Sequence, residues 1–94
     1  MKQLKDLKIT SVESLHPRFV LIKLKSDEAL PEIKPGQFVE VKVEGSASTF
    51  LRRPISINYV DKENSEIWLL VQLVGDGTRA MARLNEGDSL NVLF

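Results

Sequence analysis

Short runs of alternating hydrophobic and polar residues, separated by turn-forming residues, extend through most of the chain. Alternation with a period of two is typical of strands that bury one face. The clearest run lies at 37–44, where Val39, Val41 and Val43 share one side. Further strands are predicted around 7–12 with a bulge near Ser11, and over 18–25, 53–60, 66–74 and 88–94. A loop is predicted at 45–49 and a hairpin turn at 61–64.

One segment departs from this alternation and is predicted to be helical. Residues 78–84 are rich in alanine, methionine and leucine, and they lie between Gly77 and the stop signal Asn-Glu-Gly at 85–87. Six strands with one short helix before the last strand predict an all-β fold. We expect a small, closed or nearly closed antiparallel barrel, because closure removes the unpaired edges through which open sheets aggregate.

The predicted strand at 66–74 is apolar on both of its faces. Ile67 and Leu69 alternate with Trp68 and Leu70. A strand with one solvated face normally carries polar residues on that face. We therefore expect one face of this strand to contact something other than solvent.

Length and composition restrict the class of protein. A chain of 94 residues fits a single domain. With 43% hydrophobic and 28% charged residues it has the composition of a folded globular protein. The 13 basic and 13 acidic residues balance, which argues against indiscriminate binding to nucleic acid or anionic membrane. The charged N-terminus does not resemble a signal peptide and no stretch of about 18 apolar residues occurs, so we expect a soluble, cytoplasmic chain.

Cysteine is absent from the sequence, and His16 is its single histidine. The absence of cysteine excludes disulfides, thiolate metal sites, iron–sulfur ligation and a cysteine nucleophile within these residues. A lone histidine beside Pro17 is typical of a solvated loop. No metal-binding residue is therefore predicted, and the sequence leads to no prediction of a catalytic residue.

The first candidate for ligand binding is the segment 51–57, Leu-Arg-Arg-Pro-Ile-Ser-Ile. Arginine presents a planar fork of donors that matches phosphate, and proline makes the backbone after Arg52 and Arg53 rigid. Ser56 offers a hydroxyl or an N–H to a polar ring edge. A pair of surface arginines ahead of an edge strand is the simpler interpretation of the same residues.

The second candidate is the segment 74–80, between a predicted strand and the predicted helix. Its Gly-x-Gly-x-x-Ala spacing matches a dinucleotide fingerprint only superficially, because that fingerprint belongs to a βαβ unit. The start of a helix nevertheless exposes unpaired N–H groups that favour phosphate. Gly77 permits close approach, and Thr78 caps the helix or binds a phosphate oxygen. A capped helix after a tight turn is the alternative, but the two segments together favour a cofactor whose diphosphate contacts both.

Four motifs, in this order along the chain, resemble those of the FAD-binding barrels of the ferredoxin-reductase family. Residues 34–38 resemble the Pro-Gly-Gln-Phe stretch that leads into the third strand, and residues 53–56 resemble the Arg-x-x-Ser flavin motif. Residues 75–78 resemble the phosphate-binding turn, and residues 84–88 the approach to the last strand. The variant Leu-Arg-Arg-Pro-Ile-Ser-Ile is similar to that of the electron transfer subunits of class B dihydroorotate dehydrogenases, including Ile55 where many relatives have a tyrosine that stacks on the flavin.

The resemblance implies FAD as the cofactor and a six-stranded antiparallel Greek-key barrel. It implies that Arg53 pairs with the FAD diphosphate and that Ser56 and nearby backbone meet the flavin ring. The cofactor-binding residues implied in this way are Arg53, Pro54, Ile55, Ser56, Leu70, Val71, Gln72, Gly77 and Thr78.

The resemblance also implies a larger oxidoreductase. Residues 1–94 would be its FAD-binding domain, a fragment not expected to be active alone, and regions binding NAD(H) and a [2Fe–2S] cluster would lie outside them. The whole subunit would pass electrons between NAD and an FMN-containing dihydroorotate dehydrogenase catalytic subunit, in a heterotetramer serving pyrimidine biosynthesis. Three alternatives stay open: the barrel of a related ferredoxin–NADP or sulfide reductase subunit, a non-catalytic barrel that binds protein or oligonucleotide, and a domain that folds without retaining FAD.

Overall fold

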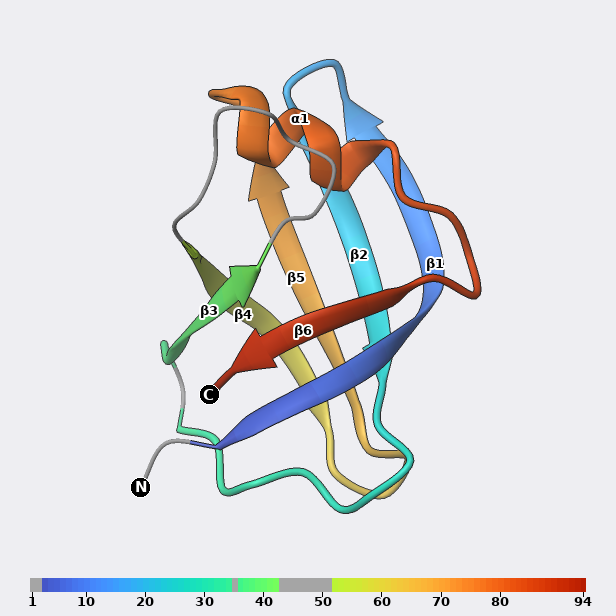
Figure 1. Ribbon diagram of the computed structural model, residues 1–94, viewed down its shortest axis with the longest axis vertical. Coiled ribbons are helices and arrows are strands. Elements are labelled where there is room, and N and C mark those ends of the chain that lie inside the picture. Colours follow the sequence, from blue (N-terminus) through green and yellow to red (C-terminus); the bar gives the residue numbers. More distant parts are fainter. Residues whose placement is uncertain (1–2, 35, 43–51) are drawn as a thin grey trace.

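Six strands and one helix form in the order that the hydrophobic pattern indicates (Figure 1). The computed structural model describes residues 3–34, 36–42 and 52–94. Positions 43 and 44 of the third predicted strand and the predicted loop at 45–49 lie outside the described residues. The elements are β1 (Leu4–His16), β2 (Phe19–Lys25), β3 (Phe38–Lys42), β4 (Arg53–Asp61), β5 (Glu66–Gln72), α1 (Asp76–Ala82) and β6 (Ser89–Leu93).

The strands close into a barrel in the order β1-β2-β5-β4-β3-β6, and every neighbouring pair is antiparallel. β3, β4 and β5 are neighbours in sequence order, whereas β2 pairs with β5. The chain after β2 therefore runs along one end of the barrel before β3 begins (Figure 1), which is a Greek-key connection. β6 pairs with both β1 and β3, so the sheet has no free edge. The prediction of an all-β, six-stranded antiparallel barrel is confirmed.

The interior of the barrel is filled by apolar side chains from alternate strand positions. Ile22, Val41 and Leu69 have no exposed surface. α1 lies across the end of the barrel at which β5 finishes (Figure 1), and its Met81 is fully buried in the same apolar cluster. The helix thus completes the core. α1 has 7 residues, and the described part of the chain holds no helix long and apolar enough to cross a membrane.

β1 is longer than the predicted strand because it pairs with two neighbours in succession. Its first part, from Leu4 to Lys8, pairs with β6, and the rest pairs with β2. The pairing with β2 shifts register between Ile9 and Ser11, so the predicted bulge near Ser11 is confirmed. A bulge bends a strand and increases its twist, which lets β1 pair with β6 at one end and with β2 at the other.

The apolar outer face of β5 is covered in part by side chains of neighbouring strands. Tyr59 lies against Trp68 with ring centroids 4.7 Å apart, and the Nζ of Lys23 lies 4.2 Å from the Trp68 ring centroid. These cross-strand contacts shield an aromatic ring without a further partner. Leu70 is not covered by them and remains 37% exposed.

The predicted hairpin turn between β4 and β5 is stabilised by hydrogen bonds between Asp61 and Asn64, its first and last residues. The Nδ2 of Asn64 donates to Asp61 Oδ2 at 2.8 Å, and the Asn64 N–H donates to Asp61 Oδ1 at 3.2 Å. The side-chain hydrogen bond from Asn64, followed by the backbone bond, lowers the pKa of Asp61 below its ordinary value of 3.8, because both favour the charged carboxylate. The hydrogen bonds that hold this turn are therefore strongest when Asp61 is ionised.

We expect Met81→Ala to lower the free energy of unfolding by about 2–5 kcal/mol, since it leaves a cavity at the end of the core. Urea denaturation followed by the fluorescence of Trp68 measures the loss. The exposed Arg83, two residues further on, provides the control, because Arg83→Ala should change the free energy by less than about 0.5 kcal/mol. Equal losses in the two variants would contradict the burial of Met81.

We expect the stability lost in Asn64→Ala to depend on pH. A carboxyl group whose folded-state pKa is lowered stabilises the protein above its ordinary pKa, and this contribution disappears as the pH falls through the lowered value. The difference in unfolding free energy between the natural chain and Asn64→Ala should therefore be full at pH 7 and shrink below the ordinary value of 3.8. Asn85→Ala is the control, because the Asn85 backbone N–H, which alanine retains, makes the bond to Asp88 Oδ2. A difference that does not change with pH would contradict this role of Asp61.

Candidate functional site

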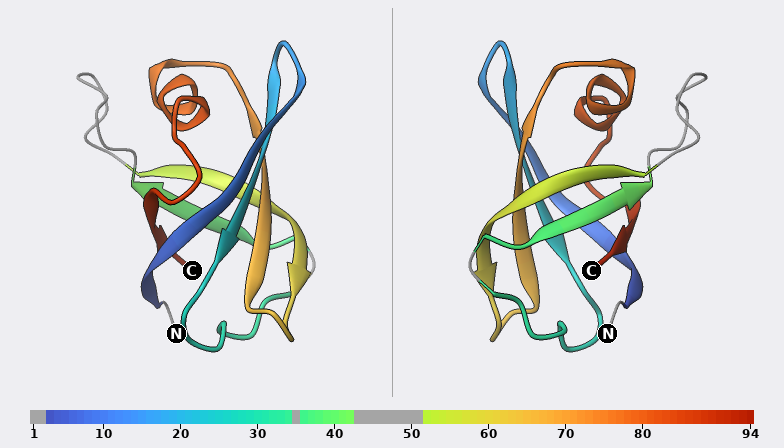
Figure 2. Two further views of the ribbon diagram at one scale, coloured as in Figure 1. Left: turned by 90° about the vertical axis from the view of Figure 1, so that its right-hand side faces the viewer. Right: turned by 90° about the vertical axis from the view of Figure 1, so that its left-hand side faces the viewer.

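β4 changes neighbours partway along its length, and this opens the sheet on one side. Its residues 53–56 pair with β3, whereas the pairing with β5 runs only from Ile57–Leu69 to Asp61–Glu66. The last residues of β5, from Leu70 to Gln72, pair with β2 alone. A register shift between Ile57 and Tyr59 bends β4 at this point, and Figure 2 shows the strand turning from β3 towards β5. The two strands therefore separate where β5 approaches α1.

A pocket of about 410 Å³ lies in the opening between β4 and β5. This volume is within the usual range for small-molecule sites, about 300–1,000 Å³. Many of the residues that the sequence predicts for cofactor binding line it. They are Pro54, Ile55 and Ser56 on β4, Leu70 and Gln72 on β5, and Thr78 on α1.

Arg53 lies beside the turn that precedes α1. An atom placed at the Cβ position of Gly75 would lie 3.4 Å from Arg53 Nη2, so the guanidinium reaches the glycine from the start of β4. Gly77 follows within the first turn of α1. The structure thus brings the guanidinium and the beginning of the helix to the same side of the barrel, although they come from segments more than twenty residues apart.

The helix begins earlier than the sequence suggests, which changes the role of Thr78. α1 spans Asp76–Ala82 and not 78–84, with Gly75 as the extended residue before its first turn. Thr78 is therefore the third helical residue, and it caps the helix start from this position, because its hydroxyl accepts the N–H of Gly75. Its hydroxyl donates to the Gly75 carbonyl at 3.0 Å and accepts the N–H groups of Val74 at 3.0 Å and Gly75 at 3.1 Å.

These three hydrogen bonds use the full capacity of the Thr78 hydroxyl, which has one donor and two acceptor positions. Thr78 is also 95% buried, being 5% exposed. The hydroxyl can therefore bind a phosphate oxygen only when one of these three hydrogen bonds is broken. The side chain holds the turn at Val74 and Gly75 in the shape that places Gly75 next to Arg53.

Two residues of the candidate segments point away from the pocket. Val71 has no exposed surface and its side chain lies inside the barrel, so only its backbone is available at the opening. Arg52 does not join Arg53, because its guanidinium donates to the carbonyls of Glu40 and Asn91 on β3 and β6. The adjacent arginines of the sequence therefore face different parts of the barrel.

Four lining residues are not among the predicted cofactor-binding residues. Ile57 and Val74 are end residues of the two candidate segments, Asn58 follows Ile57 on β4, and Phe19 begins β2. The apolar outer face of β5 was a usable signal for Val74, which is 66% exposed. No sequence signal identifies Phe19, because it reaches the pocket through its pairing with Gln72.

The chemistry of the pocket suits binding and orientation. Its described lining carries apolar side chains together with hydroxyl and amide groups, and no ionisable side chain. The positive charge of Arg53 lies beside Gly75, at the turn before the helix. Such an arrangement can hold a flat, partly polar ring and an attached anionic group.

Comparison with solved structures identifies the class of this barrel. A ferredoxin NADP+ reductase from Neisseria gonorrhoeae, solved with bound FAD and NADP, matches 95% of the chain with a TM-score of 0.73 and 22% sequence identity, and the chain covers 36% of that protein. At this identity the likeness concerns the fold alone. The predicted ferredoxin-reductase type of barrel is thereby confirmed.

Comparison with curated proteins is more specific. The electron transfer subunit of dihydroorotate dehydrogenase B (NAD(+)) from Lysinibacillus sphaericus is 46% identical over 66 residues, which are 70% of this chain and 26% of that protein. The same subunit from Streptococcus pneumoniae is 33% identical over 93 residues, 99% of this chain and 36% of that protein. No protein-family model matches. The chain belongs to the family of dihydroorotate dehydrogenase B electron transfer subunits, and it spans about a quarter to a third of the length of these relatives.

We expect Thr78→Val to lower the free energy of unfolding by about 1–3 kcal/mol, because it leaves the N–H groups of Val74 and Gly75 without their acceptor. Thr78→Ser keeps the hydroxyl and should retain most of the stability. Chemical denaturation of both variants measures the difference. If serine and valine destabilise the protein equally, the hydroxyl does not hold this turn.

Proposed function

We propose that this chain is the FAD-binding part of an electron transfer subunit that serves dihydroorotate dehydrogenase B. One observation carries the proposal. The Arg53 guanidinium and the turn before α1 lie side by side next to an amphipathic pocket, in a chain up to 46% identical to such subunits. A cationic fork next to a glycine at a helix start suits a diphosphate, and the pocket suits the ring that the diphosphate carries.

The residues present fit FAD. Gly75 has no side chain to separate the guanidinium of Arg53 from the backbone of the turn, so an anion can approach both. The opening between β4 and β5 leaves backbone groups of the two strands unpaired with each other and available to a polar ring edge. The residues that would hold FAD are Arg53, Pro54, Ile55, Ser56, Leu70, Gln72, Gly77 and Thr78, together with the backbone of Val71.

These residues bind and orient the cofactor. FAD supplies the chemistry of electron transfer when bound, and the protein determines its position and surroundings. Ile55, which stands where many related barrels have an aromatic residue, borders the pocket but is only 7% exposed and packs mainly in the core. Leu70 and Val74 are exposed and extend the apolar wall that a bound ring would cover. Ser56 and Gln72 provide the polar groups that would set the orientation of a ring.

The activity of the whole protein is part of the proposal. The relatives are named electron transfer subunits of an NAD(+)-dependent dihydroorotate dehydrogenase, and the chain corresponds to about a quarter to a third of their length. We propose that the complete subunit passes electrons between NAD and an FMN-containing catalytic subunit in cytoplasmic pyrimidine biosynthesis. Binding of NAD(H) and of a [2Fe–2S] cluster would belong to regions outside these residues, which contain no cysteine.

Flavin binding by the protein at its full encoded length tests the proposal. Titration of the apoprotein with FAD, followed by quenching of flavin fluorescence, should give saturable binding. Arg53→Ala should weaken it by about 10- to 150-fold, because a hydrogen bond to a charged group contributes about 1.5–3 kcal/mol. Riboflavin, which lacks the diphosphate, should be affected much less.

Arg83→Ala is the matched control, because it removes the same charge from an exposed position at the other end of α1. It should leave the FAD affinity unchanged. Unchanged affinity in Arg53→Ala would disprove the diphosphate role of this residue. A natural protein that binds no flavin would instead favour a barrel that binds protein or oligonucleotide.

A further inference from the structure

Arg52 has a set of partners distinct from the pocket. Its Nη1 donates to the Glu40 carbonyl at 3.3 Å and to the Asn91 carbonyl at 3.4 Å, and its Nη2 donates to Asn91 Oδ1. The side chain therefore extends from the residue before β4, past β3, to β6. Three donor contacts to two strands hold the guanidinium in place.

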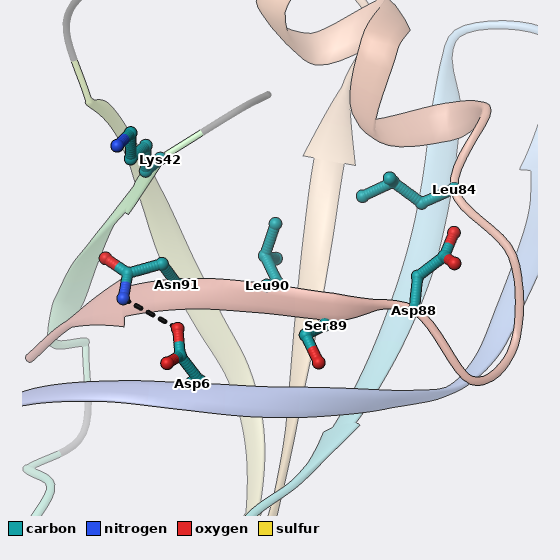
Figure 3. A pocket seen from close by; sticks show the side chains of 7 residues that line it. All are labelled: Asp6, Lys42, Leu84, Asp88, Ser89, Leu90 and Asn91. Atoms are coloured by element: carbon teal, nitrogen blue, oxygen red, sulfur yellow. Dashed lines mark hydrogen bonds between the residues drawn. The ribbon is translucent and has the colours of Figure 1, made fainter. Parts of the chain in front are cut away.

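Asn91 connects Arg52 to β1. Its Nδ2 donates to Asp6 Oδ1 on β1 at 2.8 Å, a contact drawn in Figure 3 at the wall of a groove of about 460 Å³. The amide can satisfy both partners in one orientation only, with its oxygen toward the arginine and its nitrogen toward the carboxylate. Asp6, Asn91 and Arg52 thus form a polar chain across β1, β6 and β3 that ends at the start of β4.

The start of β4 is a point where the backbone pairing is weak. Arg53 is the first residue of the β3–β4 ladder, where it pairs with Val41, and the end of a ladder is the part that opens most readily. Glu40, opposite Pro54, makes no backbone hydrogen bond to β4, because the Ile57 N–H donates to the Gln37 carbonyl and bonded pairs alternate along an antiparallel ladder. The Glu40 carbonyl accepts from Arg52. The side chain of Arg52 therefore adds an attachment at the end of the ladder.

We propose that Arg52 is the positioning residue for Arg53. By attaching the chain to β3 and β6, it fixes the direction in which the next residue leaves the strand. Arg52 directly precedes Arg53, so holding Arg52 on β3 and β6 restricts the direction of Arg53 and keeps its guanidinium beside Gly75. Arg52 contributes to anion binding only through this effect, and it does not contact the anion. The inference rests on the proposed function in taking FAD as the ligand.

A double-mutant cycle on the protein at its full encoded length tests this role. Arg52→Ala should weaken FAD binding by about three- to thirtyfold, and Asn91→Ala should do the same, because it removes the main partner of Arg52. In the Arg53→Ala background, Arg52→Ala should change the FAD affinity by less than about twofold, since the group that it positions is gone. Riboflavin affinity should stay the same in all of these variants. Arg83→Ala again controls for the lost charge.

Penalties that simply multiply in the double variant would overturn the inference, because they would mean that Arg52 acts independently of Arg53. Equal losses of riboflavin and FAD affinity would also overturn it, since a general structural defect affects both ligands. So would loss of the cooperative unfolding transition in both Arg52→Ala and Asn91→Ala. The proposed function fails separately, when the natural protein does not bind FAD or when Arg53→Ala binds FAD as tightly as the natural protein does.

Discussion

Closure of six short strands into one barrel is the constraint on which the rest of this structure depends. Every strand pairs on both sides, and β4 pairs with β3 along its first half and with β5 along its second half. It bends between the two halves, at the register shift between Ile57 and Tyr59. The bend separates β4 from the end of β5, and the pocket is the space that this separation leaves. The binding site is thus a consequence of how the barrel closes.

The same closure explains why one end of the barrel carries the candidate chemistry. β5 passes directly into the turn before α1, while β4 begins at that same end, so Arg53 and Gly75 meet there. Met81 ties the helix to the core, and the Thr78 hydroxyl ties the helix to the turn. The anion-binding side of the proposed site is therefore held by the packing of the barrel.

The two adjacent arginines, Arg52 and Arg53, contact different parts of the barrel. Arg53 lies beside the helix start, whereas the Arg52 guanidinium donates to the carbonyls of Glu40 on β3 and Asn91 on β6. Positive charge at the site therefore comes from one arginine of the pair. The other one links that site to the junction of β1, β6 and β3 through Asn91 and Asp6.

The sequence by itself determined the class of fold, the order of the elements and most of the lining residues on β4 and β5. Alternating hydrophobic positions and turn residues are local signals, and the motif from Arg53 to Ser56 is contiguous. Only the tertiary structure decided that Phe19 reaches the pocket and that Arg52 leaves the site for β3 and β6. Each of these depends on which strands pair and where β4 bends. Pairing between distant segments is set by closure of the whole sheet, so no local pattern records it.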